Sequence, residues 1–111
     1  MLAVELRKSA MLVRIHVDET RITAFCKRNG IRRFAFFGSV LRPDFGPESD
    51  VDVLVDFDPE SVPGLLGIAR MERELSGYLA GRKVDIRTRE DLSRYFRQRV
   101  VDESEVLYVR R

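Results

Sequence analysis

The sequence predicts an α/β fold of the α+β type, in which helices pack mainly on one face of a small mixed β-sheet. Three observations predict it. Apolar and acidic residues alternate over residues 50–57, as they do along a strand, and apolar residues recur at helical spacing over residues 64–80. The expected elements also follow in the order helix, strand, short helix, strand, helix, strand, helix. That order fits a sheet of three or four strands with helices on one side.

The first helix with a clear start is expected after Asp18, whose carboxylate suits an N-cap. Val17 and Ile22 stand at the two positions of a hydrophobic staple around that cap. Gly30 is expected to end the helix. Residues 1–14 show only weak helical patterning.

A short strand rich in aromatic residues is expected over residues 31–37. A Gly-Ser pair interrupts it, and residues 39–42 can open a short helix. Proline, glycine and aspartate mark residues 42–49 as a loop. The strand over residues 50–57 is the clearest element, because its odd positions are apolar and its even positions are mostly acidic.

Residues 64–80 are expected to form a helix that ends at Gly81. The apolar stripe of this helix is expected to consist of Leu65, Ile68, Ala69, Leu75 and Leu79. Residues 83–87 then fit a short strand with two aliphatic side chains on one face and Asp85 on the other.

Thr88 is expected to cap a further helix, with Asp91 at the capping-box position. The apolar stripe of that helix is expected to consist of Leu92, Tyr95 and Phe96. Residues 105–109 fit either a last helical turn or an edge strand.

Composition places the chain among globular proteins. A length of 111 residues, with 44% hydrophobic and 34% charged residues, predicts one domain over residues 1–111 and argues against disorder. Met11 is an equally good start of the chain, so residues 1–10 are expected to be a frayed extension.

Cys26 and His16 are each the only residue of their type, which excludes an internal disulfide, a cysteine-based zinc site and any mechanism that needs two histidines. No apolar run approaches the roughly 18 residues of a membrane span, and a cytoplasmic location is expected.

Charge is nearly balanced overall but unevenly distributed. Residues 43–69 carry seven acidic side chains and no basic one, while residues 1–42 carry nine basic and three acidic ones. An acidic centre between basic flanks suits a site that holds cations against a polyanionic ligand.

Two carboxylates are expected to share one face of the clearest strand. Asp50 and Asp52 are two positions apart, so both side chains point the same way, with Cα atoms about 6.6 Å apart. If the strand that contains Asp85 lies next to theirs, Asp85 completes a cluster of three carboxylates. Oxygen ligands without histidine or cysteine favour Mg²⁺, or Mn²⁺, over zinc. Asp56 and Asp58 are expected to be strand-end acids rather than ligands.

A phosphate-binding turn is expected beside these carboxylates. Gly38 and Ser39 follow a strand directly and open a short helix, which exposes backbone N–H groups to an anion. Ser39 adds a hydroxyl donor, and Arg42 is placed to contact a phosphate oxygen. Together with the carboxylates, this turn suits a Mg-nucleotide.

Three runs resemble the signature of the minimal nucleotidyltransferases, which belong to the DNA polymerase β-like nucleotidyltransferase superfamily. They are GSVLR at 38–42, SDVDVLVDF at 49–57 and RKVD at 82–85. The resemblance implies a palm-like catalytic core, metal coordination by Asp50 and Asp52, and binding of the nucleotide's phosphates by the turn. It implies that Asp85 is the third metal-binding carboxylate and helps to activate the acceptor hydroxyl. Pro43, where the family often has glycine, removes one N–H donor from the loop.

Family members of this length often act as antitoxins that transfer AMP from ATP to a tyrosine of a partner HEPN ribonuclease toxin. The resemblance therefore implies a Mg²⁺-dependent adenylyltransferase with ATP as substrate and a HEPN toxin as partner. Two alternatives stay open: a non-catalytic antitoxin that masks the toxin, and transfer to a small-molecule hydroxyl. Nucleic acid is not expected as the acceptor, because the basic residues are spread over both flanks without clear aromatic interleaving.

Overall fold

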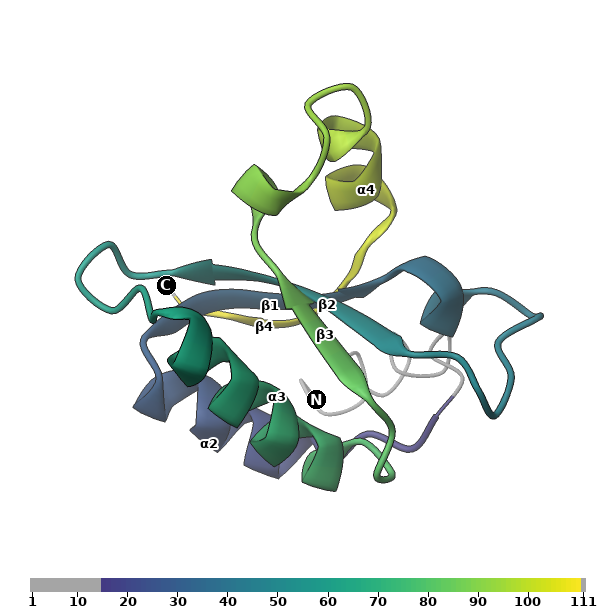
Figure 1. Ribbon diagram of the computed structural model, residues 1–111, viewed down its shortest axis with the longest axis horizontal. Coiled ribbons are helices and arrows are strands. Elements are labelled where there is room, and N and C mark those ends of the chain that lie inside the picture. The colour runs from purple at the N-terminus through teal and green to yellow at the C-terminus, as the bar shows by residue number, and fades with distance from the viewer. Residues whose placement is uncertain (1–14, 111) are drawn as a thin grey trace.

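The computed structural model describes residues 15–110, which form a four-stranded sheet with helices on both sides (Figure 1). The elements in chain order are α2 (Glu19–Arg28), β1 (Ile31–Phe37), the 3-10 helix η1 (Gly38–Leu41), β2 (Val51–Phe57), α3 (Leu65–Tyr78), β3 (Val84–Arg87), the 3-10 helix η2 (Arg89–Asp91), α4 (Arg97–Glu103) and β4 (Glu105–Val109). The expectations for residues 1–10 and the weak helical pattern over 1–14 lie outside the described residues.

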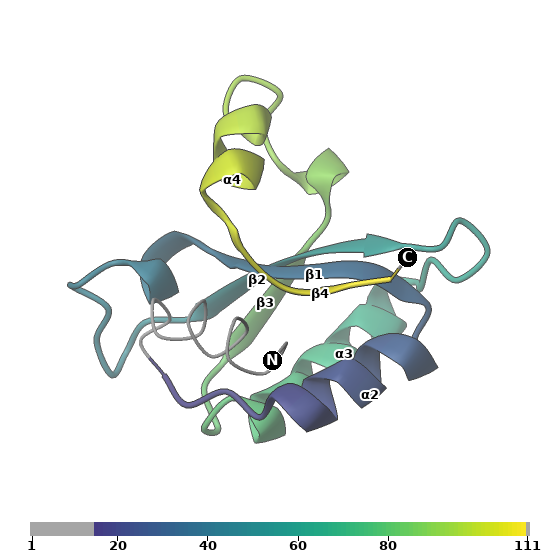
Figure 2. The same ribbon diagram turned by 180° about the vertical axis from the view of Figure 1, so that it is seen from behind.

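The sheet is mixed and has the strand order β3-β2-β1-β4. Strand β1 pairs antiparallel with β2 and with β4, whereas β2 pairs parallel with β3 through the α3 crossover. Helices α2 and α3 lie side by side on one face of the sheet, and α4 stands on the opposite side (Figures 1 and 2). The predicted fold class, a small mixed sheet with helices mainly on one face, is confirmed.

The core lies between the sheet and the pair of helices α2 and α3. Three odd positions of β2, Val51, Val53 and Val55, are fully buried there, as the alternation in the sequence predicts, and they pack with residues of both helices, while Phe57 at the end of the strand is partly buried. Cys26 of α2 belongs to this core, and burial raises the pKa of its thiol to about 12. Its side chain therefore stays protonated and serves as a small apolar group.

The expected boundaries of the first helix are confirmed by its contacts. The Asp18 carboxylate accepts a hydrogen bond from the backbone N–H of Arg21, with an N–O distance of 3.2 Å. Gly30 follows the helix with φ of +66°, a left-handed conformation that glycine adopts without strain.

Two expected apolar stripes differ from the structure. In the first, Leu75 and Leu79 are fully buried and Ile68 packs against the core, as predicted, but Leu65 is 90% exposed and Met71, which the prediction did not include, joins the buried face. Leu65 is the first residue of its helix, and helical side chains lean toward the N-terminus, so its side chain extends past the end of the element.

The helix expected after Thr88 is only one turn long. The Thr88–Asp91 capping box is present, but it opens the three-residue helix η2, and α4 begins separately at Arg97. Tyr95 and Phe96 lie between the two helices with 79% and 58% of their surface exposed, so the prediction that they form a buried stripe is wrong. A capping box stabilises the first turn of a helix, whereas a longer helix also needs an apolar face that is buried against the rest of the protein.

Residues 105–109, for which the sequence allows a helical turn or an edge strand, form the edge strand β4. Among the described residues, no helix has the length and apolar character needed to cross a membrane.

We predict that Leu75→Ala lowers the free energy of unfolding by about 2–5 kcal/mol, because the Leu75 side chain is fully buried and its loss leaves a cavity. Leu65→Ala is the matched control on the same helix and should change stability by less than about 0.5 kcal/mol. Urea unfolding of both variants tests this, and equal losses would contradict the assignment of the buried face.

Candidate active site

Parallel pairing of β2 and β3 places two of the three predicted carboxylates side by side. Asp52 lies opposite Asp85 in the register of the two strands, so both side chains project from the same face of the sheet. Asp50 immediately precedes β2 and lies two residues from Asp52. This face is opposite the one covered by α2 and α3, and it remains accessible: the side chains of Asp50 and Asp85 are 45% and 34% exposed.

Burial and neighbouring charges together set the pKa of the Asp52 carboxyl. Partial burial raises the pKa of the Asp52 carboxyl above its ordinary value. The negative charges of Asp85 and Asp50 raise this pKa further, while the positive charges of Arg87 and Arg42 oppose the rise. A cation placed among the carboxylates would relieve this repulsion.

Two basic side chains already contact the carboxylates. Arg87 donates to Oδ2 of Asp85 from both Nε and Nη2, with distances of 3.2 and 2.8 Å. Lys83 Nζ lies 3.9 Å from Oδ2 of Asp50. Sequence reasoning missed Arg87, although its position two residues after Asp85 on a strand indicates that both side chains share a face.

The donor chemistry of this face fits a hard divalent cation, since all three candidate ligands supply carboxylate oxygens. The arrangement of the three carboxylates differs from the expected cluster of metal ligands, however. Within residues 15–110, no three histidine, cysteine, aspartate or glutamate side chains are gathered closely enough to hold a metal ion together. Asp85 is instead turned to Arg87. The three carboxylates thus share a face of the sheet without converging on one point.

The Gly38 turn lies directly against Asp52. Phe37, the last residue of β1, pairs with Asp52, and Gly38 follows with φ of +75°. A Cβ atom at Gly38 would lie 2.7 Å from Oδ2 of Asp52, so only glycine allows this close approach.

Ser39 and Arg42 have partners within the protein. The Ser39 hydroxyl donates to the backbone carbonyl of Asp50 at 3.3 Å, which ties the turn to the start of β2. The Arg42 side chain is 65% exposed and lies 3.6 Å from the carboxylate of Asp44. The expected short helix after Gly38 exists, but as the four-residue 3-10 helix η1, so it offers one turn of backbone N–H groups.

The two further acids of β2 and its end are paired with arginines. Arg89 donates to both oxygens of Asp56 at 3.0 and 3.1 Å, and Arg110 contacts both oxygens of Asp58. These ion pairs tie the segments after β3 and β4 to β2, which gives both acids a structural partner.

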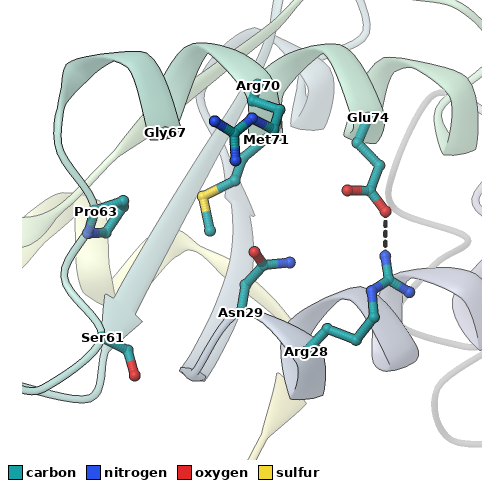
Figure 3. Close-up of a pocket in the computed structure, with 8 residues that line it drawn as sticks. All are labelled: Arg28, Asn29, Ser61, Pro63, Gly67, Arg70, Met71 and Glu74. Carbon is teal, nitrogen blue, oxygen red and sulfur yellow. Dashed lines mark hydrogen bonds and ion pairs between the residues drawn. The ribbon is translucent and has the colours of Figure 1, made fainter.

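Hollows lie beside these elements, among them one of about 320 Å³ between α3 and the start of β3, and none of the three carboxylates lines that hollow or either of the two that follow. One, of about 330 Å³, begins at the turn and extends to α4. Its lining residues are Phe37, Gly38, Arg42, Phe96, Arg99, Val100 and Glu103. The other, of about 300 Å³, lies between α2 and α3 on the opposite side of the sheet, where Arg28 and Glu74 form an ion pair across it (Figure 3).

Comparisons with known proteins agree with this geometry. Residues 19–108 match the model of the nucleotidyltransferase domain family. The chain is 37% identical over 83 residues to the protein adenylyltransferase MntA of Thermococcus cleftensis, an alignment that covers 75% of this chain and 79% of that one.

Solved structures show the same fold. A toxin–antitoxin structure with AMP-PNP superposes with a TM-score of 0.67 at 19% identity, over 84% of this chain and 74% of that one. A tri-AMPylated Shewanella oneidensis HEPN toxin in complex with an MNT antitoxin gives a TM-score of 0.59 at 19% identity, over 82% of this chain and 69% of that one.

The resemblance drawn from three short runs of the sequence is thus confirmed over nearly the whole described chain. The strand pairing that places Asp52 beside Asp85, the turn held against Asp52, and the match over residues 19–108 agree with one another. The chain belongs to the nucleotidyltransferase domain family.

Proposed function

We propose that this chain is a protein adenylyltransferase that transfers AMP from ATP to a tyrosine hydroxyl of a HEPN ribonuclease toxin and thereby acts as its antitoxin, in the cytoplasm. The observation that carries the proposal is the register of β2 and β3, which sets Asp52 opposite Asp85 beside the Gly38 turn. The relative from T. cleftensis is named a protein adenylyltransferase, and the similar complex from S. oneidensis contains an AMPylated HEPN toxin with its antitoxin.

In this reaction the oxygen of the acceptor hydroxyl attacks the α-phosphorus of ATP. A new oxygen–phosphorus bond forms, the bond between the α-phosphorus and the oxygen bridging to the β-phosphate breaks, and pyrophosphate leaves. The hydroxyl proton goes to a base, for which the partly exposed Asp85 carboxylate is our candidate. The backbone of the Gly38–Ser39 turn binds the phosphates, and Arg42 adds a positive charge beside them.

We assign Mg²⁺, or Mn²⁺, to the carboxylate face, with Asp50 and Asp52 as the principal ligands and Asp85 as the third. A divalent cation there supplies neutralisation of the charge that develops on the phosphates during transfer. The raised pKa of Asp52 supports this assignment, because besides the partial burial of Asp52 it reflects the negative charges of Asp85 and Asp50 nearby. Arg87 neutralises Asp85 in the structure, so we assign it the role of keeping that carboxylate in place until the ligands assemble.

The first prediction of this proposal concerns the metal ligands. Asp50→Asn and Asp52→Asn should each lower AMP transfer from labelled ATP to the toxin by at least about a hundredfold, because each removes a charged oxygen ligand. Circular dichroism should show an unchanged fold. Glu60→Gln is the matched control from the same acidic segment, and it should retain full activity, since its exposed side chain lies after the end of β2.

The same variants separate catalysis from masking. The Asp50→Asn, Asp52→Asn double variant should still bind the toxin but fail to protect cells that produce it. Full protection by the double variant would establish masking and overturn the enzymatic proposal.

A second prediction concerns pH. Because the folded-state pKa of Asp52 is raised, its ionised form costs stability at neutral pH, and this cost disappears as the pH falls through the folded-state pKa. Asp52→Asn should therefore unfold at higher urea concentration than the wild type at about pH 7 in EDTA, and the difference should shrink toward about pH 4.

Asp58→Asn is the control of opposite sign. Its hydrogen bonds with Arg110 lower the pKa of Asp58, so ionisation of Asp58 adds stability above its ordinary pKa, and this stability is lost as the pH falls. Asp58→Asn should thus be destabilised at neutral pH. Equal behaviour of the two variants would contradict the proposed charge repulsion at Asp52.

A third prediction concerns the turn. Gly38→Ala should lower stability by about 1–2 kcal/mol through its left-handed backbone and should lower AMP transfer by displacing Asp52. Gly77→Ala, inside α3 with open space around it, should instead raise stability by about 0.5–1 kcal/mol and leave transfer intact. Urea unfolding and the transfer assay measure both effects, and retention of full transfer by Gly38→Ala would remove the turn from the site.

A further inference from the structure

The hollow between the Gly38 turn and α4 is lined mostly by residues that the proposed chemistry does not use. Phe37 and Phe96 contribute two aromatic rings to it, and Arg99 and Glu103 contribute charges from α4. Its volume of about 330 Å³ lies at the lower end of the range for small-molecule sites. Phe96 keeps 58% of its surface exposed, which is unusual for a phenylalanine.

We propose that this hollow binds the nucleoside part of ATP, with Phe96 stacking on the base and Glu103 selecting a base that carries an amino group. The inference rests on the proposed function, because it takes the Gly38 turn as the phosphate site. Gly38 lines the hollow and belongs to that turn, so a nucleoside attached to bound phosphates is within reach of the hollow.

The lining favours a nucleoside over the acceptor side chain. The acceptor hydroxyl has to reach the face that carries Asp85, and Asp85 does not line the hollow. An aromatic ring beside a positively charged side chain is the usual surface for stacking a base, whatever its identity. Phe96 provides the ring, and Arg99 provides the charge on the adjacent helix.

Glu103 supplies the selectivity between different bases that stacking does not provide. An ionised carboxylate only accepts hydrogen bonds, so it pairs with the exocyclic amino group of adenine and repels the carbonyl oxygen that hypoxanthine carries at the same position. Arg99 Nε lies 3.5 Å from Oε2 of Glu103, one turn away on α4, and orients the carboxylate. Because the Glu103 side chain is 69% exposed, we expect the preference for ATP over ITP to be modest, about three- to tenfold.

The test is calorimetric titration of the full chain with three probes in Mg²⁺: ATP, ITP and inorganic tripolyphosphate. Phe96→Ala should weaken ATP binding about ten- to a hundredfold and leave tripolyphosphate binding unchanged, because only ATP carries a base. Phe96→Trp should restore ATP binding. Tyr95→Ala is the matched control, since Tyr95 is the neighbouring exposed aromatic residue and does not line the hollow.

Glu103→Gln should reduce the ratio of ATP to ITP affinity to about one, because an amide both donates and accepts. Asp102→Asn, next to it and outside the lining, should keep the wild-type ratio. The inference is overturned if Phe96→Ala binds ATP as the wild type does, or if it weakens ATP and tripolyphosphate equally. It is also overturned if Phe96→Ala raises only the KM for the toxin, which would assign the hollow to the acceptor. If the wild type binds neither ATP nor tripolyphosphate, the proposed function is itself wrong, and this inference falls with it.

Discussion

The candidate site depends on the parallel pairing of β2 with β3. Each strand carries a carboxylate on the face turned away from the core, and the register sets Asp52 opposite Asp85. Two like charges directly opposite each other destabilise a strand pair. The pairing is maintained because the other face of the same strands is buried: Val51 and Val53 pack with α2 and α3, together with Ile86 of β3. A one-residue slip would turn these aliphatic side chains to solvent, so the register that buries the core is also the register that gathers the acids.

Arginines compensate the acidic face at three places. Arg87 holds Asp85, Arg89 holds Asp56, and Arg110 holds Asp58. The first of these pairs lies in the site, the second lies further along β2, and the third lies just after the end of that strand. Asp50 and Asp52 have no comparable arginine contact within the described residues; the nearest cation to Asp50 is Lys83 at 3.9 Å. Of the three carboxylates proposed as metal ligands, the two principal ones, Asp50 and Asp52, are thus left without an arginine contact in the described part of the chain.

Local patterns predicted the fold well, and long-range packing explains what they missed. The alternation over residues 50–57 identifies both faces of β2, and Asp18 and Gly30 bound α2, because strand periodicity and helix caps depend on neighbouring residues alone. Leu65 and Phe96 are exposed because of where their helices begin relative to the sheet, and no local sequence pattern predicts that position. For the site, spacing placed Asp50 and Asp52 on one face. Spacing alone could not show that Asp85 lies near them, because that depends on which strands are neighbours in the sheet. The contact of Arg87 with Asp85 requires a side-chain conformation that spacing does not determine.

The position of β3 at the border of the sheet has a consequence for the size of the substrates that the protein can serve. Its outer side has no neighbouring strand among the described residues, so the carboxylate it carries lies at the rim of the sheet, where 34% of the side chain is exposed. An acceptor does not have to enter the protein to reach such a rim. A folded macromolecule can present one side chain there while the rest of its bulk stays outside, which a deep pocket would prevent. A domain too small to enclose its acceptor can in this way modify one much larger than any cavity it contains.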